Sequence, residues 1–338
     1  MLRPAGTAAI AILTATLCAC GGGDDPQPQA ARACDREASP GPRAVQRLVD
    51  SLRPGQVGCL RQGTYHGTVS IRRAGRPGQP ITLRPRPGAR ARLVGALMVT
   101  RRASDVIVRG LHLDGRNRDN DPSPIVNGRR IRFVDNDVTN DHTSICFALG
   151  NPRFGVARDV TIQRNRIHDC GKLPATNLEQ GVYVALARDT RVVGNWIYAN
   201  ADQGVQLYPD ARGTYVAGNV IDGNGEGIIF GGAELVAASG NLVQGNVISN
   251  SQIRSNVEWH FDGPVGRDNV LRRNCIGGGV RDAGNGGIME PQIGFTALEN
   301  LVAGPAFRGA GDYRLVAGSA CRKVFSGDPD RVPGPPRR

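Results

Sequence analysis

A short pattern recurs through the middle of the chain. Alternating apolar residues lead to an Asn, with another apolar residue two positions later, as in RVVGNWI (191–197) and YVAGNVI (215–221). The Asn recurs at steps of 29, 30, 24, 27 and 28 residues. Self-similarity at such a period indicates a repeat protein. The six positions are Asn136, Asn165, Asn195, Asn219, Asn246 and Asn274.

The spacing of the apolar residues identifies the kind of repeat. They alternate in short runs that Gly, Asn and Asp interrupt, which predicts strands and turns rather than helices. Each period holds two or three such runs, about enough chain for one coil of a parallel β-helix. Stacked coils place equal positions roughly 4.8 Å apart, so the Asn side chains can bond amide to amide in a ladder. We therefore predict an all-β fold, one parallel β-helix.

Two segments resemble known families. Residues 104–295, with their repeated Asn turns, resemble the right-handed parallel β-helix proteins of the pectate-lyase-like superfamily. Residues 50–95 contain Leu-Arg-Pro-Gly, Gly-Thr-Tyr and Pro-Ile-Thr-Leu, and they resemble the opening coils of the alginate lyase and chondroitinase B-like polysaccharide lyases. The resemblance implies a right-handed solenoid. Those lyases carry catalytic Lys and Arg in Asn-Lys-Ser and Arg-His-Gly motifs, which this chain lacks, so no catalytic residue carries over.

The two ends of the chain differ from the repeats. Residues 1–20 have the charged start, apolar run and small residues of a secretory signal. Leu17 to Cys20 resembles a lipoprotein cleavage box, which implies lipidation at Cys20; plain secretion is the alternative. We expect a tether over 21–38, a β-helix over 39–322 and a disordered tail over 323–338. A solenoid needs caps at its ends, and we assign these to a short helix at 43–52 and to the segment 311–321.

The cysteine count agrees with export. Six Cys lie beyond the signal, and an even number in an exported chain indicates disulfides. Buried free thiols are the alternative. We favour pairing between neighbours in the sequence, Cys34–Cys59, Cys146–Cys170 and Cys275–Cys321. The expected location is extracellular or in the cell envelope, either secreted or held at a membrane surface by the lipid anchor.

The net charge of +12 comes from forty Arg and two Lys against 30 acidic residues. Such a charge favours an anionic partner, an acidic polysaccharide or a phospholipid surface. The Arg are scattered and no aromatic–basic stripe accompanies them, so we do not expect nucleic-acid binding. We expect a monomer without a cofactor. No metal-ligand spacing appears, although scattered Asp could hold Ca²⁺.

The strand after each polar turn predicts an outer surface. Alternation sends one set of side chains inward, and we expect Ile145, Phe147 and their equivalents there. One outward row is Cys146, Tyr183, Gln206, Ile229, Glu258 and Met289, and the next is Ala148, Ala185, Tyr208, Gly231 and His260. The second row predicts a shallow groove with Tyr208 and His260 as walls, two coils or roughly 10 Å apart.

One coil carries extra residues beside this groove. From the ladder Asn to the next strand is 16 residues after Asn165, against 8 to 10 in four other coils. The insertion brings Lys172 and Glu179, and an insertion on one coil often marks a binding face. We propose His260, Tyr208 or Lys172 as a base and Arg188 or Lys172 as the group that neutralises a carboxylate. Substrate contacts are assigned to Tyr183, Gln206, Glu226 and Glu258.

These residues predict an extracellular protein that binds a polysaccharide and cleaves an acidic glycan by β-elimination. A non-catalytic carbohydrate-binding or structural cell-envelope protein is the alternative. A glycoside hydrolase, with carboxylates drawn from Asp202, Asp210, Glu226 and Glu258, or a uronate epimerase is the third hypothesis. Fold alone does not choose among them, and the sequence identifies neither the sugar nor the reaction.

Overall fold

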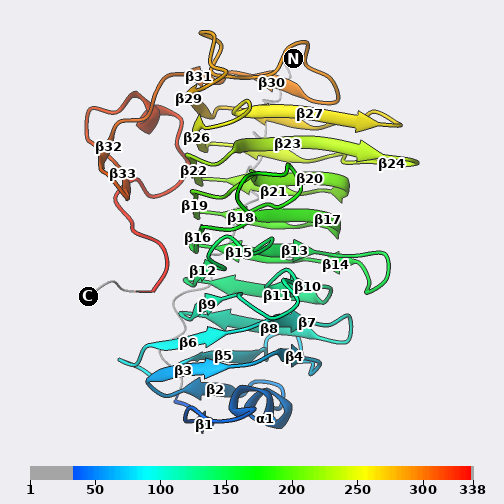
Figure 1. Cartoon of the computed structure of the whole chain (residues 1–338), viewed down its shortest axis with the longest axis vertical. Helices are drawn as coiled ribbons and strands as arrows, with labels where there is room; N and C mark the ends of the chain where they lie inside the picture. Colours follow the sequence, from blue (N-terminus) through cyan, green and yellow to red (C-terminus); the bar gives the residue numbers. More distant parts are fainter. Residues whose placement is uncertain (1–32, 336–338) are drawn as a thin grey trace, which may run out of the picture. The chain divides into compact units, whose positions relative to one another are not determined.

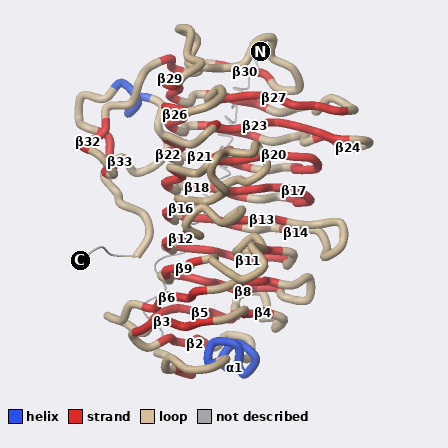
Figure 2. The backbone as a smooth tube through the Cα atoms, in the orientation of Figure 1, coloured by secondary structure: helices blue, strands red, loops and turns tan. Residues whose placement is uncertain are grey.

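The alternating runs form strands that stack in parallel register around one axis, as the computed structural model of the chain shows for residues 33–335 (Figure 1). The result is a right-handed parallel β-helix. Its 21-stranded sheet bends into two faces, A and B, and a separate ten-stranded sheet forms face C. Each coil runs from face B through the Asn turn to face C, and then to face A (Figure 2).

The strands of each face follow one another at intervals of one coil. Face A contains β4 (Val69–Ile71), β7 (Leu97–Val99), β10 (Ile125–Val126), β13 (Phe147–Leu149), β17 (Val182–Arg188), β20 (Gln203–Arg212), β23 (Glu226–Ala233) and β27 (Val257–Asp262). Face B contains β1 (Arg36–Ala38), β2 (Val57–Leu60), β5 (Ile81–Pro85), β8 (Ser104–Arg109), β11 (Arg129–Val134), β15 (Thr161–Gln163), β18 (Arg191–Val193), β21 (Tyr215–Ala217), β25 (Leu242–Gln244), β28 (Val270–Arg272) and β30 (Thr296–Leu298).

Face C is the ten-stranded sheet. It contains β3 (Gly63–His66), β6 (Ala91–Val94), β9 (His112–Asp114), β12 (Asp137–Thr139), β16 (Arg166–His168), β19 (Trp196–Tyr198), β22 (Val220–Asp222), β26 (Val247–Ser251), β29 (Cys275–Gly279) and β31 (Leu301–Val302). Two short strands join the corners of faces A and B, β14 (Ala157–Arg158) and β24 (Val236–Ala237).

The predicted asparagine ladder is present. From Asn136 to Asn274, each Nδ2 donates to Oδ1 of the Asn in the next coil at 2.9–3.0 Å. The ladder continues one coil further, to Asn300. Each Oδ1 also accepts the backbone N–H of the preceding Asn, as Asn219 does from Asn195 at 2.9 Å. The residue before each ladder Asn has positive φ, which explains why the sequence places Gly194 and Gly218 there.

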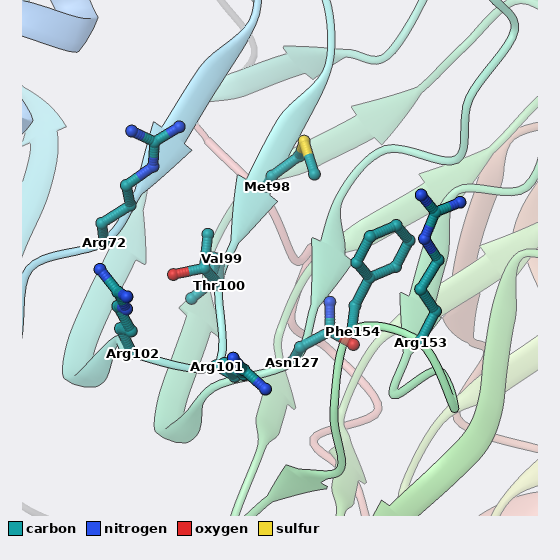
Figure 3. Close-up of a pocket in the computed structure, with 9 residues that line it drawn as sticks. All are labelled: Arg72, Met98, Val99, Thr100, Arg101, Arg102, Asn127, Arg153 and Phe154. Carbon is teal, nitrogen blue, oxygen red and sulfur yellow. The ribbon is translucent and has the colours of Figure 1, made fainter.

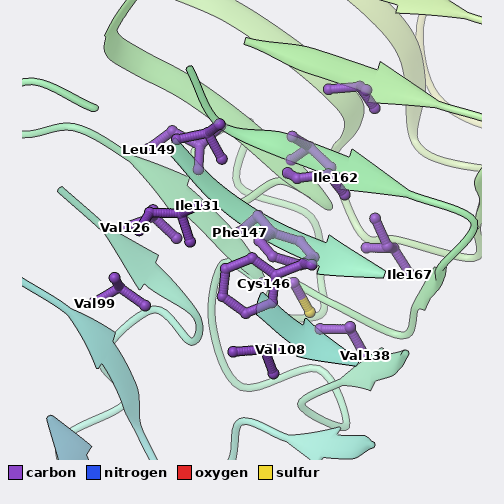
Figure 4. Packing of buried hydrophobic residues seen from close by; sticks show 14 of the residues in the cluster. Val99, Val108, Val126, Ile131, Val138, Cys146, Phe147, Leu149, Ile162 and Ile167 are labelled. Atoms are coloured by element: carbon purple, nitrogen blue, oxygen red, sulfur yellow. The ribbon is translucent and has the colours of Figure 1, made fainter. Parts of the chain in front are cut away.

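The interior consists of apolar columns that the same register creates. Val99, Val126 and Leu149 stack on face A, and Val138 and Ile167 stack on face C (Figure 4). Phe133 and Phe147 meet edge to face with their ring centroids 5.1 Å apart. Burying one such side chain stabilises the fold by about 1.5–3 kcal/mol, so each added coil contributes its own increment.

The N-terminal helix, α1 (Ala44–Ser51), packs on the first coil with the apolar face that the sequence predicts. Leu48 and Leu52 lie so close to β2 that a Cβ on Gly58 would be 2.9 Å from Leu52 and 3.2 Å from Leu48. Cys34 and Cys59 form a disulfide next to this contact. The placement is what a cap requires; the capping role itself stays a prediction. Between residues 33 and 335, no helix combines the length and hydropathy of a membrane-spanning segment.

The C-terminal segment differs from the expectation. We predicted that residues 311–321 would close the last coil, but β32 (Phe307–Gly309), β33 (Asp312–Leu315) and the 3₁₀ helix at Ala320–Lys323 lie along face C (Figure 1). The reason is an outward apolar column on that face, which the segment covers through a cluster that includes Trp196, Tyr313 and the Cys275–Cys321 disulfide. Leu298 and Val302 of the last coil stay about half exposed.

The tail also differs from the expectation of disorder. Residues 323–335 continue along face C, where Arg166 donates to the carbonyls of Pro333 (3.1 Å) and Pro335 (3.3 Å). The signal, the tether up to residue 32 and Cys20 lie outside the described residues. The remaining predicted pair, Cys146–Cys170, is also a disulfide, so all three favoured pairings occur in the structure.

Replacing Asn219 with Ala tests the ladder. The change leaves buried partners on Asn195, Asn246 and Val192 without hydrogen bonds. An unsatisfied buried group costs about 1–3 kcal/mol, so we expect a loss of at least about 3 kcal/mol in urea unfolding. Asn300→Ala, at the end of the ladder, is the matched control and should lose less. An equal loss in both variants would contradict the cooperative ladder.

Candidate functional site

The outward side chains of face A form two columns along the solenoid. The first runs in register from Ser70 through Met98, Ile125, Ala148, Tyr183, Gln206 and Ile229 to Glu258. The second is two residues further along each strand and includes Arg72, Thr100, Asn127, Gly150, Ala185, Tyr208, Gly231 and His260. This second column carries most of the candidate chemistry.

The N-terminal coils of face A contain a basic pocket of about 360 Å³. Arg72 and Arg102 lie on one side and Arg153 and Phe154 on the other, with Thr100 and Asn127 between them (Figure 3). Arg101, Met98 and Val99 complete the lining. The pocket therefore combines four guanidinium groups with an exposed aromatic ring.

No carboxylate neutralises this pocket. Within residues 33–335, the side chains of Arg72, Arg101 and Arg102 have no ion pair, and Arg153 contacts only the ring of Phe154, 5.4 Å from its centroid. At the floor, Thr100 Oγ1 and Asn127 Oδ1 are buried and have no hydrogen-bond partner in the described chain. A polar ligand or water molecule in the pocket would supply one, and a negative charge would be attracted by the guanidinium groups.

Local sequence explains how the pocket forms. Arg-Arg follows the apolar strand in two successive coils, at 72–73 after β4 and at 101–102 after β7. The opposite wall is a tight turn, in which Phe154 N–H donates to Asn151 O at 3.1 Å. Our sequence analysis did not identify this pocket. The repeated Arg-Arg pair at equivalent positions of neighbouring coils is the signal that could have revealed it.

An arginine file continues from the pocket along the edge of face A. Arg129, Arg158, Arg188 and Arg212 pair in register across four coils. The guanidinium groups of Arg129 and Arg158 have no hydrogen bond or ion pair among the residues that the structure describes. Strand spacing separates successive members by roughly 4.8 Å. The file is therefore a linear array of positive charge parallel to the solenoid axis.

Tyr208 and His260 approach each other more closely than predicted. Their ring centroids are 6.5 Å apart, not roughly 10 Å, because Gly231 between them has no side chain. A Cβ there would lie 2.7 Å from the Tyr208 ring and 2.6 Å from His260 O. His260 Nε2 is 2.8 Å from Asp262 Oδ2.

The two tyrosines of this face remain protonated. Burial, followed by the negative charges of Asp262 and Glu234, raises the pKa of Tyr208. Burial, with a smaller effect of Tyr208, raises the pKa of Tyr183 to about 12. Both phenols are therefore proton donors near neutral pH, and His260 is the better candidate base in this column.

The predicted register of one strand was wrong by two residues. We aligned Cys146 with Tyr183, whereas the structure pairs Ala148 with Tyr183. Phe147 and Leu149 consequently point inward, while Ile145 is only half-buried. The disulfide to Cys170 holds Cys146 in the corner before β13, and nothing in the local pattern marks this delayed start.

The two predicted neutralising cations are already paired. Lys172 Nζ lies 3.2 Å from Glu179 Oε1, and Arg188 donates to the carboxylate and carbonyl of Asp210. The inserted loop is anchored at its far end, where Asp202 accepts the backbone N–H groups of residues 177–179 at 2.8–3.0 Å. The structure therefore does not bring a free cation from this loop to Tyr208 and His260.

Glu226 and Glu258 lie beneath the surface rather than on the groove, so the structure does not support direct substrate contact. Each is 1% exposed. Glu258 accepts two hydrogen bonds from Arg254, at 2.9 and 2.7 Å, which hold its pKa below the ordinary value although burial opposes this. Burial, followed by the charge of Glu258, raises the pKa of Glu226 to about 8.

The predicted substrate contacts Tyr183 and Gln206 do lie half-buried on the outer surface of face A. Metal binding has less support from the geometry. Among residues 33–335, no group of three or more His, Cys, Asp and Glu side chains is arranged to hold a metal ion.

Glu226→Gln tests the buried acid. Because the pKa of Glu226 rises from 4.5 to about 8 on folding, the folded state binds more protons between these values, and stability should fall as the pH rises through this window. The substitution should flatten that part of the dependence of melting temperature on pH. Exposed Glu234→Gln is the control and should behave like the unmodified protein. An unchanged profile in Glu226→Gln would contradict the assignment.

Comparisons with solved structures agree with this architecture. Pectate lyase Pel9A superimposes with a TM-score of 0.59 at 13% identity, covering 85% of this chain and 82% of its own. An alginate lyase from Paenibacillus sp. str. FPU-7 gives 0.55 at 14% identity, covering 81% and 98%. The A-module of the Azotobacter vinelandii mannuronan C-5 epimerase AlgE4 gives 0.51 at 16%, covering 79% and 77%. At these identities the likeness concerns the fold.

Curated protein sequences contain no match to this chain. A family model described as the right handed beta helix region matches residues 107–276, half of the 338 residues. The matched segment includes the six predicted ladder asparagines and the strands of face A from β10 to β27. The chain belongs to the right-handed β-helix family.

Proposed function

We propose that the protein binds an acidic polysaccharide along face A. The observation that carries this proposal is the basic pocket, in which Arg72, Arg101, Arg102 and Arg153 face no carboxylate. A uronate residue offers a carboxylate, which matches the guanidinium fork, and a sugar ring, which can pack on Phe154. The three neighbours named above are proteins that act on uronate polymers by their titles or on pectate, which supports this substrate class.

The arginine file supports an orientation for the polymer. Arg129 and Arg158 extend the positive charge from the pocket toward Tyr183, Gln206 and Tyr208. A chain of repeating carboxylates lying parallel to the axis would meet charge at several coils. A single neutral sugar would gain little from such a file, so we favour a polymer with a carboxylate on many residues.

A second proposal is that the bound polymer is cleaved by β-elimination. His260, oriented by Asp262, would take the C5 proton of a uronate; the C4–O4 bond would break, and Tyr208 would protonate the leaving oxygen. The product carries a C4=C5 double bond. This chemistry needs a cation at the uronate carboxylate, yet Arg188 and Lys172 are paired with Asp210 and Glu179. The geometry therefore supports binding more strongly than cleavage, and a non-catalytic carbohydrate-binding protein is the alternative.

Export fits this proposal. The three disulfides belong to an oxidising compartment, where extracellular polysaccharides occur. We propose that the protein is secreted and held at a membrane surface through Cys20, which lies outside the described residues.

The double variant Arg101→Ala/Arg102→Ala tests binding. We expect the Kd for alginate or polygalacturonate, measured by isothermal titration calorimetry, to rise at least about tenfold, a loss of about 1.4 kcal/mol. Arg281→Ala, which removes an exposed Arg from a distant loop, should bind normally, and EDTA should have no effect. Unchanged affinity in the double variant would refute the pocket's role.

Cleavage is tested by incubation with alginate, pectate and chondroitin while absorbance from an unsaturated uronate is recorded. His260→Ala and Tyr208→Phe should lower the rate about 100-fold or more and leave the Kd for substrate within a factor of about two. Tyr215→Phe, on face B, is the control. No absorbance gain with any polymer would leave binding alone. New reducing ends without absorbance would indicate a hydrolase, and an altered uronate ratio at constant chain length an epimerase.

A further inference from the structure

A second basic cleft lies at the corner of faces B and C, across the solenoid from face A. It has a volume of about 620 Å³ and is lined by five arginines, Arg84, Arg86, Arg90, Arg109 and Arg166, together with His112, Asp137 and the C-terminal Pro335. This volume is typical of sites for small molecules. The polysaccharide proposal makes no use of this cleft.

Differences in turn length between coils create the cleft. After β5 the chain makes a wide turn through residues 86–90, whereas the next coils turn tightly at Gly110–Leu111 and Asp135–Asn136. The wide turn stands out as a wall beside the tight ones. On the far side, the C-terminal segment is held by Arg166, and Gly334 N–H donates to Arg164 O at 2.8 Å. The cleft is thus enclosed by two segments far apart in the sequence.

The charges that line the cleft do not balance. Against the five guanidinium groups stands the carboxylate of Asp137, which Arg166 contacts at 2.9 Å. Glu37 lies 3.6 Å from Arg86 and Asp135 lies 3.0 Å from Arg109. Three carboxylates therefore face five guanidinium groups, which leaves two positive charges. The Arg90 side chain has no hydrogen bond or ion pair among residues 33–335.

Two of the arginines destabilise each other. Burial, and then the positive charge of Arg109, lowers the pKa of Arg84. On the opposite wall Asp137 is fully committed: burial alone would raise its pKa, but hydrogen bonds from His112, His168 and Arg166 hold it well below the ordinary range. Asp137 therefore cannot serve as the counter-ion of Arg84 and Arg109, and an external anion would lower the electrostatic energy of the site.

We propose that this cleft binds a dianionic phosphate group, either as the free ion or as a monoester on a small molecule such as a sugar. Two uncompensated positive charges match the two negative charges of phosphate near neutral pH, and guanidinium groups bind phosphate oxygens in bidentate fashion. The room in the cleft exceeds that of a bare ion, so a monoester can be accommodated. This proposal is independent of the function proposed for face A.

Calorimetric titration of the full chain tests it with four probes: inorganic phosphate, glucose 6-phosphate, glucose and glucuronate. Both phosphate compounds should bind, and glucose should not. Glucuronate, with one charge, should bind at least about tenfold more weakly, which is about 1.4 kcal/mol. Tighter binding of glucose 6-phosphate than of inorganic phosphate identifies the monoester as the source; the reverse identifies the free ion. Affinity should fall below about pH 6, where phosphate gains a proton.

Variants locate the site. Arg84→Gln and Arg90→Gln should each weaken binding of the tighter phosphate compound about tenfold or more. Arg281→Ala and the face A variant Arg101→Ala/Arg102→Ala should not change it, which separates this site from the polysaccharide site. Arg90 lies on an exposed loop, so its replacement should preserve the fold, with circular dichroism as the check. No binding of either phosphate compound, equal binding of glucuronate, or affinity unaffected by Arg84→Gln and Arg90→Gln would overturn the proposal.

Discussion

The hydrogen bond between stacked asparagine amides is the interaction on which the rest of this structure depends. Each rung joins two coils through side-chain and backbone donors at once. A one-residue slip of any coil would break a rung above and a rung below. The ladder thus fixes the vertical register, and the register places Val on Val and Ile on Ile inside.

The same register organises the outer surface. Once the coils are aligned, residues at equal positions form columns, and arginines at equal positions form the file from Arg129 to Arg212. Pockets arise where a coil departs from the common turn length. The turn at 151–155 makes one wall of the basic pocket on face A, and the wide turn at 86–90 makes one wall of the cleft between faces B and C. Regular positions determine direction and spacing, and irregular turns create the concave sites.

The sequence was sufficient where the periodic pattern was strong. The ladder, the inward columns of β17 to β27 and the three disulfide pairings all follow from spacing. Prediction failed where tertiary contacts decide the outcome. The strand at Phe147 starts late because a disulfide holds Cys146 in the corner. The C-terminal segment packs along face C because an apolar column there must be covered, and burial of Glu226 and Glu258 depends on Arg254, which the repeat pattern does not reveal.

The central claim is that face A is an acidic-polymer surface whose strongest contacts are in the basic pocket. A crystal structure of the protein with an oligouronate bound is its most direct test. The account predicts density for an oligomer parallel to the solenoid axis, with a carboxylate within hydrogen-bond distance of Arg101 or Arg102 and a ring on Phe154. An oligomer bound to another face, or lying across face A without contact to these arginines, would contradict the account.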